Sequence, residues 1–152
     1  ETGRIAADYF QIGDDLSGNS LGLVQYSEEG IDILCRSWPD FCDNSSYRII
    51  EVDFRDRGAI LYAEINASNV YWQELGIALV LNDDNITFQP VGIILDGEAL
   101  SFPTSGPVAR ALNTLIEKGN EALRSAFIRS GPYELRLDAL RLTEESLTIV
   151  LR

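Results

Sequence analysis

Few side chains in this sequence are suited to nucleophilic catalysis, because the chain has no His and a single Lys. Residues 18–22 read Gly-Asn-Ser-Leu-Gly and match the G-x-S-x-G pattern that presents a nucleophilic serine between a strand and a helix. The residues that follow have the pattern of an extended strand instead of a helix, and no His is present to accept the serine proton. Lys118, the other possible partner for a serine, falls on the polar side of a predicted helix. We therefore interpret residues 18–22 as a glycine turn.

Carboxylates are abundant, with 24 Asp and Glu residues, so paired acids could in principle act in acid–base chemistry. Glu51 and Asp53 alternate along a predicted strand, where charged side chains are ordinarily solvated. The acidic stretches 14–15 and 82–85 suit turns, and neither has the ligand spacing of a calcium loop. The sequence therefore predicts a protein that is not an enzyme and that holds no metal or other cofactor.

Cys35 and Cys42 are the two cysteines of the chain and lie close together in the sequence. An even count at short spacing is typical of a local disulfide in an exported protein, and two thiols without a His are too few ligands for a metal site. Two buried free thiols are the alternative. We expect a disulfide that fastens the end of a helix and stabilises the fold by about 2.5 kcal/mol through loop closure.

The formal net charge of −12 is unevenly distributed along the chain. Residues 1–103 carry a net charge of −13, whereas residues 104–152 carry +1. Nucleic acid is excluded as a partner, because binding to phosphates requires a basic face. The acidic charge favours solubility, with a partner-binding acidic face as the alternative. The absence of Met predicts that an N-terminal segment has been removed, and a cleaved signal peptide, a lipoprotein leader or a truncation would each explain it.

The length of 152 residues suits one domain. We predict that residues 1–20 are a loosely ordered lead-in and that residues 21–152 form a single α+β domain. A short helix is expected from Ser27 to Pro39. Alternating residues then predict a hairpin over residues 49–65, with its turn at residues 55–58.

A second hairpin is predicted from a strand over residues 70–81 and a returning strand over residues 86–95. Pro90 cannot donate a backbone hydrogen bond, so the returning strand should lie at an edge or contain a bulge.

The longest predicted element is an amphipathic helix over residues 107–128. Gly119 is unfavourable in its interior by up to about 1 kcal/mol, so we expect the backbone of another segment to approach it closely. Two strands, over residues 135–142 and 147–151, follow this helix. The order of elements predicts an α+β fold in which a long twisted antiparallel sheet is wrapped around one long C-terminal helix, with a short N-terminal helix in addition.

Apolar surface is therefore the main candidate for function. A sheet wrapped on one helix leaves a groove along its open side, where an acyl chain could replace missing side chains. An ordinary solid core is the alternative for the same residues. The residues expected to line the groove are Leu61, Ile65, Trp72, Leu79, Phe88, Ile93, Leu112, Ile116 and Gly119.

The last third of the chain resembles a known family. Residues 97–103 (GEALSFP), 133–143 (YELRLDALRLT) and 146–150 (SLTIV), with the long helix, resemble bacterial extracytoplasmic proteins of the YpmS/LmeA-like kind. The segment over residues 50–65 fits the same layout, so the resemblance covers most of the chain after residue 25 and consists of hydrophobic patterns. It implies a tubular lipid-binding (TULIP-like) type of fold, a membrane-anchored N-terminus and no enzymatic activity.

The sequence thus leads to one main functional hypothesis. We expect a non-catalytic module outside the cytoplasm, either secreted, periplasmic or anchored through a removed N-terminal segment. It would bind a lipid or another hydrophobic small molecule in a groove between the long helix and the sheet. The alternative is a structural or protein-interaction domain of the cell envelope, with a solid core and an acidic partner-binding face.

Overall fold

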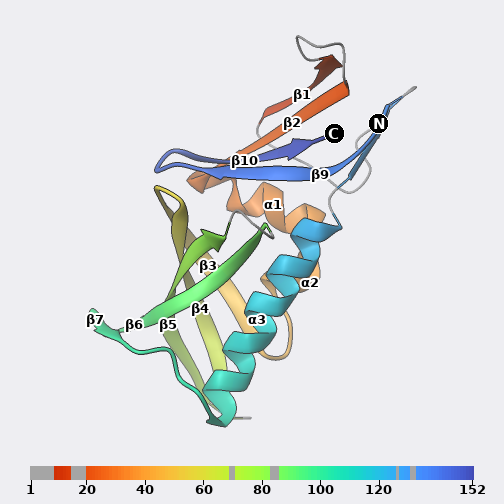
Figure 1. Ribbon diagram of the computed structural model, residues 1–152. Helices are drawn as coiled ribbons and strands as arrows, with labels where there is room; N and C mark the ends of the chain where they lie inside the picture. The colour runs from red at the N-terminus through yellow and green to blue at the C-terminus, as the bar shows by residue number, and fades with distance from the viewer. Residues whose placement is uncertain (1–8, 15–19, 69–70, 83–85, 126, 131–132) are drawn as a thin grey trace.

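The computed structural model describes residues 9–14, 20–68, 71–82, 86–125, 127–130 and 133–152. Within these residues the chain forms two five-stranded antiparallel sheets and one long helix, α3 (Figure 1). The upper sheet in Figure 1 has the strand order β1 (Tyr9–Asp14), β2 (Ser20–Ser27), β10 (Ser146–Leu151), β9 (Tyr133–Leu142) and β8 (Phe127–Ser130). The lower sheet has the order β3 (Tyr47–Arg55), β4 (Gly58–Ser68), β5 (Tyr71–Asn82), β6 (Thr87–Leu95) and β7 (Glu98–Leu100).

The lower sheet is a meander in which each strand pairs with the next one in the sequence. The predicted hairpin over residues 49–65 is confirmed by the pairing of β3 with β4. Its turn depends on Arg57, which has a positive φ of 60°, and on Gly58. A Cβ atom on Gly58 would lie 2.6 Å from the carbonyl oxygen of Leu79, so only glycine allows the backbone of β5 to come this close.

The bulge expected at Pro90 is also confirmed. Along the pair of β5 and β6, Ala78 lies opposite Gly92 and the next residue, Leu79, lies opposite Pro90. Val91 is therefore the extra residue of a β-bulge, and it is largely exposed. The missing N–H of proline thus coincides with a break in the ladder.

The upper sheet joins the two ends of the described chain. β10 lies between β2 and β9, and Val24 of β2 is opposite Ile149 of β10. β1 falls within the predicted lead-in and pairs with β2 along its whole length, whereas residues 1–8 and 15–19 lie outside the described residues.

The helical segments lie beside and between the sheets. A 3₁₀ turn, η1 (Glu28–Gly30), leads into α1 (Ile31–Ser37), and Pro39 begins a second short helix, α2 (Pro39–Cys42), because proline is well suited to the first helical turn. α3 (Gly106–Arg124) packs against β4, β6 and α2, and its C-terminal end points towards the upper sheet (Figure 1).

The predicted fold class is wrong in two respects. The strands form two separate sheets instead of one long sheet wrapped around a helix, and α3 lies in the middle of the element order, followed by β8, β9 and β10. The predicted helix over residues 107–128 ends at Arg124, and residues 127–130 form β8, which pairs with β9. The pairing with β9 provides hydrogen-bond partners for backbone N–H and C=O groups of residues 127–130. The helical periodicity of the local sequence does not reveal this pairing.

The two sheets are tied together at the tip of the β3–β4 hairpin. The backbone N–H of Arg57 donates to the carbonyl oxygen of Leu142 at the end of β9, with a distance of 3.0 Å. The backbone N–H of Phe54 donates to the Glu28 carboxylate in η1, at 2.7 Å. Buried apolar residues of both sheets and of α3 form one continuous core. The space between the two sheets at this junction, here called the wedge, is therefore bordered by η1, α1 and α3.

Candidate apolar binding site

An apolar cavity of about 80 Å³ lies in the wedge between the two sheets. Its walls come from β2, β9 and β10 of the upper sheet, from β3, β4, β5 and β6 of the lower sheet, from all the helical segments and from Trp38 between α1 and α2. The lining residues are Tyr26, Ser27, Gly30, Ile31, Leu34, Trp38, Phe41, Val52, Phe54, Ala59, Leu61, Leu79, Phe88, Leu115, Ile116, Gly119, Asn120, Ala122, Leu123, Leu142 and Leu147. Nearly all of these side chains are apolar, so the cavity suits a hydrocarbon group.

The C-terminal half of α3 forms one wall of the cavity. Leu115, Gly119 and Ala122 recur at spacings of four and three, which places them on one face of a helix. Gly119 and Ala122 are small, whereas the N-terminal half of the same face carries Leu112, which is fully buried. The cavity therefore lies beside the part of α3 where the side chains are shortest.

Asn120 fixes this half of α3 to the lower sheet. Its Oδ1 accepts the backbone N–H of Phe88 at 2.8 Å, and its Nδ2 donates to the carbonyl oxygen of Phe88 at 3.2 Å. β7 pairs only with residues 93–95 of β6, so the side chain of Asn120 takes the position of a neighbouring strand at Phe88. The amide thus holds α3 against the edge of β6 and leaves Phe88 at the cavity wall.

The ring of Phe41 occupies the space that a side chain at position 119 of α3 would fill. A Cβ atom on Gly119 would lie 2.9 Å from Cε1 of Phe41, so the ring of Phe41 rests directly on the helix backbone. The close approach expected at this glycine is present, but it is made by a side chain of α2 and not by the backbone of another segment. Phe41 lines the cavity at the same point.

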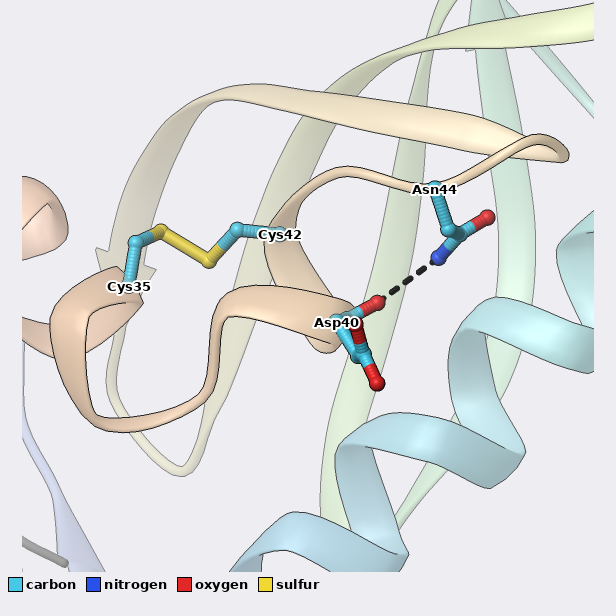
Figure 2. Close-up of a disulfide and its surroundings, with 4 residues drawn as sticks. All are labelled: Cys35, Asp40, Cys42 and Asn44. Carbon is cyan, nitrogen blue, oxygen red and sulfur yellow. Dashed lines mark hydrogen bonds between the residues drawn. A yellow bond between two sulfur atoms is a disulfide. The ribbon is translucent and has the colours of Figure 1, made fainter.

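The corner that carries Trp38 and Phe41 is held by covalent and polar links. The predicted disulfide between Cys35 of α1 and Cys42 of α2 is confirmed (Figure 2). Asn44 Nδ2 donates to the carbonyl oxygen of Asp40 at 2.8 Å, as Figure 2 also shows. The disulfide therefore holds α2 to α1, and the amide holds α2 to the segment that leads into β3.

A buried tyrosine follows this corner. Asn44 Oδ1 accepts the backbone N–H of Tyr47 at 3.2 Å at the start of β3. The Tyr47 side chain is fully buried, and this burial raises its pKa from the ordinary value of 10.0 to about 12.

The structure brings together five of the nine residues that were predicted to line a groove. Leu61, Leu79, Phe88, Ile116 and Gly119 all line the cavity. The other four do not. Ile65, Ile93 and Leu112 lie in the solid core, and Trp72 lies on the face of the lower sheet that is turned away from α3. There the guanidinium of Arg48 stacks 4.4 Å from the centre of the Trp72 ring.

The cavity also has walls that sequence reasoning missed. Tyr26, Leu142 and Leu147 come from the upper sheet, and Leu34 and Phe41 come from the short helices. The helical spacing around Leu34 was a usable signal for an inward face. The approach of the upper sheet depends on the pairing of β2 with β10, and no local pattern shows that contact.

The polar candidates do not gather into a second site in the described part of the chain. Glu51 is exposed, and Asp53 pairs with Arg55 at 2.7 Å. Among the described residues no three His, Cys, Asp or Glu side chains are placed to hold a metal ion together. Residues 15 and 83–85, which belong to the two acidic stretches, lie outside the described residues, as do Gly18 and Asn19 of the glycine turn.

No helix in the described residues has the length and hydropathy needed to cross a membrane. Comparisons of the chain with protein-family models, curated proteins and solved structures gave no match. The resemblance to YpmS/LmeA-like proteins therefore stays a prediction.

Proposed function

We propose that this protein is a non-catalytic module that works outside the cytoplasm and binds an apolar ligand, such as the end of a lipid chain, in the cavity between its two sheets. The single observation that supports the proposal is the cavity of about 80 Å³ with its apolar lining. Protein interiors are normally packed with few voids larger than a water molecule.

The volume of the cavity limits the size of its ligand. A cavity of about 150 Å³ accommodates benzene, so this one takes a small apolar group or a few terminal carbons of a chain. The ligand site proposed here is thus shorter than a groove running along the whole of α3.

The disulfide supports the proposed location. Disulfides persist in oxidising compartments and are rare in reducing ones. The Cys35–Cys42 bond therefore favours a secreted, periplasmic or envelope-attached protein.

Xenon and a small hydrocarbon test the site directly. Methyl NMR spectra of the oxidised protein recorded under xenon pressure, or with dissolved n-pentane, should show shifts of the methyl groups of Leu34, Leu115 and Ile116. The methyl groups of Ile65 in the solid core serve as the internal control. Absence of any selective shift at the cavity methyl groups would contradict the proposal.

A pair of leucine variants on α3 locates the binding. Ala122→Leu places three additional carbons at the cavity wall and should abolish the xenon shifts without unfolding the protein. Asn113→Leu adds a leucine to the exposed side of the same helix and should leave the shifts unchanged. Equal effects of the two substitutions would show that xenon binds elsewhere. Native mass spectrometry of the protein purified from an oxidising compartment then reports any cargo.

A second candidate function rests on the outer face of the lower sheet, which is turned away from α3. Val80 is 41% exposed there, beside the partly exposed Ile60 and Ala78. Glu64 and Glu74 lie opposite each other on the same face, and Arg48 lies opposite Glu64 on β3, so the surface combines apolar groups with two carboxylates and one guanidinium. A protein partner with a basic and apolar surface would complement it.

Neutralising variants separate the two candidates. Replacement of Glu64 and Glu74 by Gln should weaken a salt-sensitive interaction with an envelope protein, whereas Ala122→Leu should not affect it. If the cavity variant alone changes the interaction, the outer face is not the contact surface.

A further inference from the structure

A second hollow adjoins the cavity on the solvent side of α2 and α3. It is a depression of about 320 Å³. Three residues, Trp38, Phe41 and Ala122, line both the depression and the cavity, so they form the boundary between them. The complete lining of the depression is Trp38, Pro39, Asp40, Phe41, Lys118, Glu121, Ala122 and Ser125. These three shared side chains therefore separate the apolar cavity from the more polar depression.

The boundary is thin because of Gly119. The ring of Phe41 lies on the helix backbone where a side chain would otherwise project. Phe41 is only partly buried, and a different side-chain rotamer would remove its ring from this position. Displacement of this one aromatic ring would connect the depression with the cavity.

Trp38, which lines both hollows, carries an unused hydrogen-bond donor. The residue is 8% exposed, and its Nε1–H has no hydrogen-bond partner among the described residues. The indole nitrogen can only donate, and buried donors in native proteins are almost always paired. The missing partner is an acceptor, and a ligand seated across the boundary would carry one, such as an ester or amide carbonyl oxygen.

The charges around the depression limit the head group of such a ligand. Asp40 and Glu121 contribute two carboxylates and Lys118 contributes one ammonium group, so the lining has a net charge of −1. The whole chain has a formal net charge of −12. An anionic head group would be repelled both locally and by the field of the protein.

We propose that the depression and the cavity form one site for a single-chain amphiphile whose head group has no net charge. Its chain end lies in the cavity beyond Phe41, and its carbonyl oxygen accepts the indole N–H of Trp38. This inference rests on the proposed function, because it requires that the cavity takes an apolar group. The inference adds to the proposed function that the head group of the ligand has no net charge and that the ligand binds with its chain end in the cavity.

Two ligands of equal chain length test the inference. 1-Octanoylglycerol is uncharged and has an ester carbonyl, whereas octanoate has the same chain with an anionic head. In ¹H–¹⁵N spectra, 1-octanoylglycerol should shift the indole N–H signal of Trp38 downfield and leave that of Trp72 in place. Trp72 is the matched control, because it lies on the outer face of the lower sheet. The Kd for octanoate should be several-fold higher than the Kd for 1-octanoylglycerol near pH 7.5. Glu121→Gln should bring the two Kd values closer together, because it removes one of the carboxylates that repel the anionic head group.

A variant supplies the second readout. Trp38→Phe retains an aromatic ring and removes the donor, so the Kd for 1-octanoylglycerol should rise by about tenfold while xenon binding is retained. The indole signal of the unmodified protein tests the inference even if this variant does not fold.

The outcomes distinguish the inference from the proposed function. Methyl shifts at the cavity without a shift of the Trp38 indole signal would overturn the hydrogen bond and leave the apolar site in place. Octanoate binding as tightly as 1-octanoylglycerol would overturn the assignment of an uncharged head. Failure of both xenon and 1-octanoylglycerol to shift any cavity methyl group would refute the proposed function itself.

Discussion

The contact of Asn120 with β6 provides the sharpest test of how α3 is held at the cavity. Its side-chain amide makes two hydrogen bonds to the backbone of Phe88, one as acceptor and one as donor. Asn120→Ala removes both bonds. At about 1 kcal/mol for each bond, with a further penalty for the partly buried Phe88 groups left unpaired, the loss is roughly 2 to 3 kcal/mol. The higher helix propensity of Ala offsets about 0.5 kcal/mol of it.

Asn120→Asp makes the test independent of side-chain size. The aspartate has the same shape and still accepts the N–H of Phe88, but its second oxygen would face the carbonyl oxygen of Phe88. Its negative charge also lies near the C-terminus of α3, where the helix dipole disfavours it. We therefore expect Asn120→Asp to be at least as destabilising as Asn120→Ala at pH 7.

Thermal and urea unfolding measure both changes. A loss of 2 kcal/mol corresponds to a decrease in Tm of about 4 to 8 °C for a chain of this length. Hydrogen exchange should also become faster at the Phe88 amide. Asn113→Ala, on the exposed side of α3, is the control and should change the free energy of unfolding by less than about 0.5 kcal/mol. If Asn120→Ala and Asn120→Asp are both as stable as the unmodified protein, the amide does not hold α3 to the sheet.

Three further predictions concern other contacts. Replacement of Cys35 and Cys42 by Ala should lower the free energy of unfolding by about 2.5 kcal/mol, because the loop between them is no longer closed; a change below 1 kcal/mol in urea titrations would contradict this. Burial raises the pKa of Tyr47 to about 12, whereas the same phenol has its ordinary pKa of 10.0 in the unfolded chain. The contribution of the neutral phenol to the free energy of unfolding is therefore complete below pH 10 and is lost as the pH rises through 12. The decrease, up to about 3 kcal/mol, should be smaller in Tyr47→Phe when both proteins are melted across this range. Glu28→Gln should cost about 1 kcal/mol by replacing the charged acceptor of the Phe54 N–H, and Glu28→Ala should cost more; equal stability of the two variants would show that this bond is unimportant.

Local features of the fold could be read from the sequence. The alternation over residues 49–65 predicts the β3–β4 hairpin, and Pro90 marks the bulge in β6. The spacing of Cys35 and Cys42 predicts their bond. Each of these features depends on residues that are close together in the chain, so nearby side chains and backbone chemistry are sufficient to specify them.

Features that depend on distant residues could not be read in this way. Alternation shows that residues 147–151 form a strand but does not show that the strand lies beside β2, and so one sheet was predicted where there are two. For the same reason the predicted site extended along α3 to Leu112, and it omitted the upper-sheet wall around Tyr26 and Leu147. Five cavity residues were identified because they lie on α3 and on the lower sheet, where the local patterns were sufficient.

The pairing of β2 with β10 has a consequence for the order of folding. The bond from Gln25 Nε2 to Thr148 Oγ1 joins residues that are 123 positions apart, whereas the strands of the lower sheet pair with their neighbours in the chain. Contacts between distant residues form slowly, so the hairpins of both sheets should form first and the pairing of β2 with β10, which completes the upper sheet, should form last. The cavity is bordered by both sheets and exists only after this final step. A ligand in the cavity should therefore slow the unfolding of the protein more than it accelerates folding.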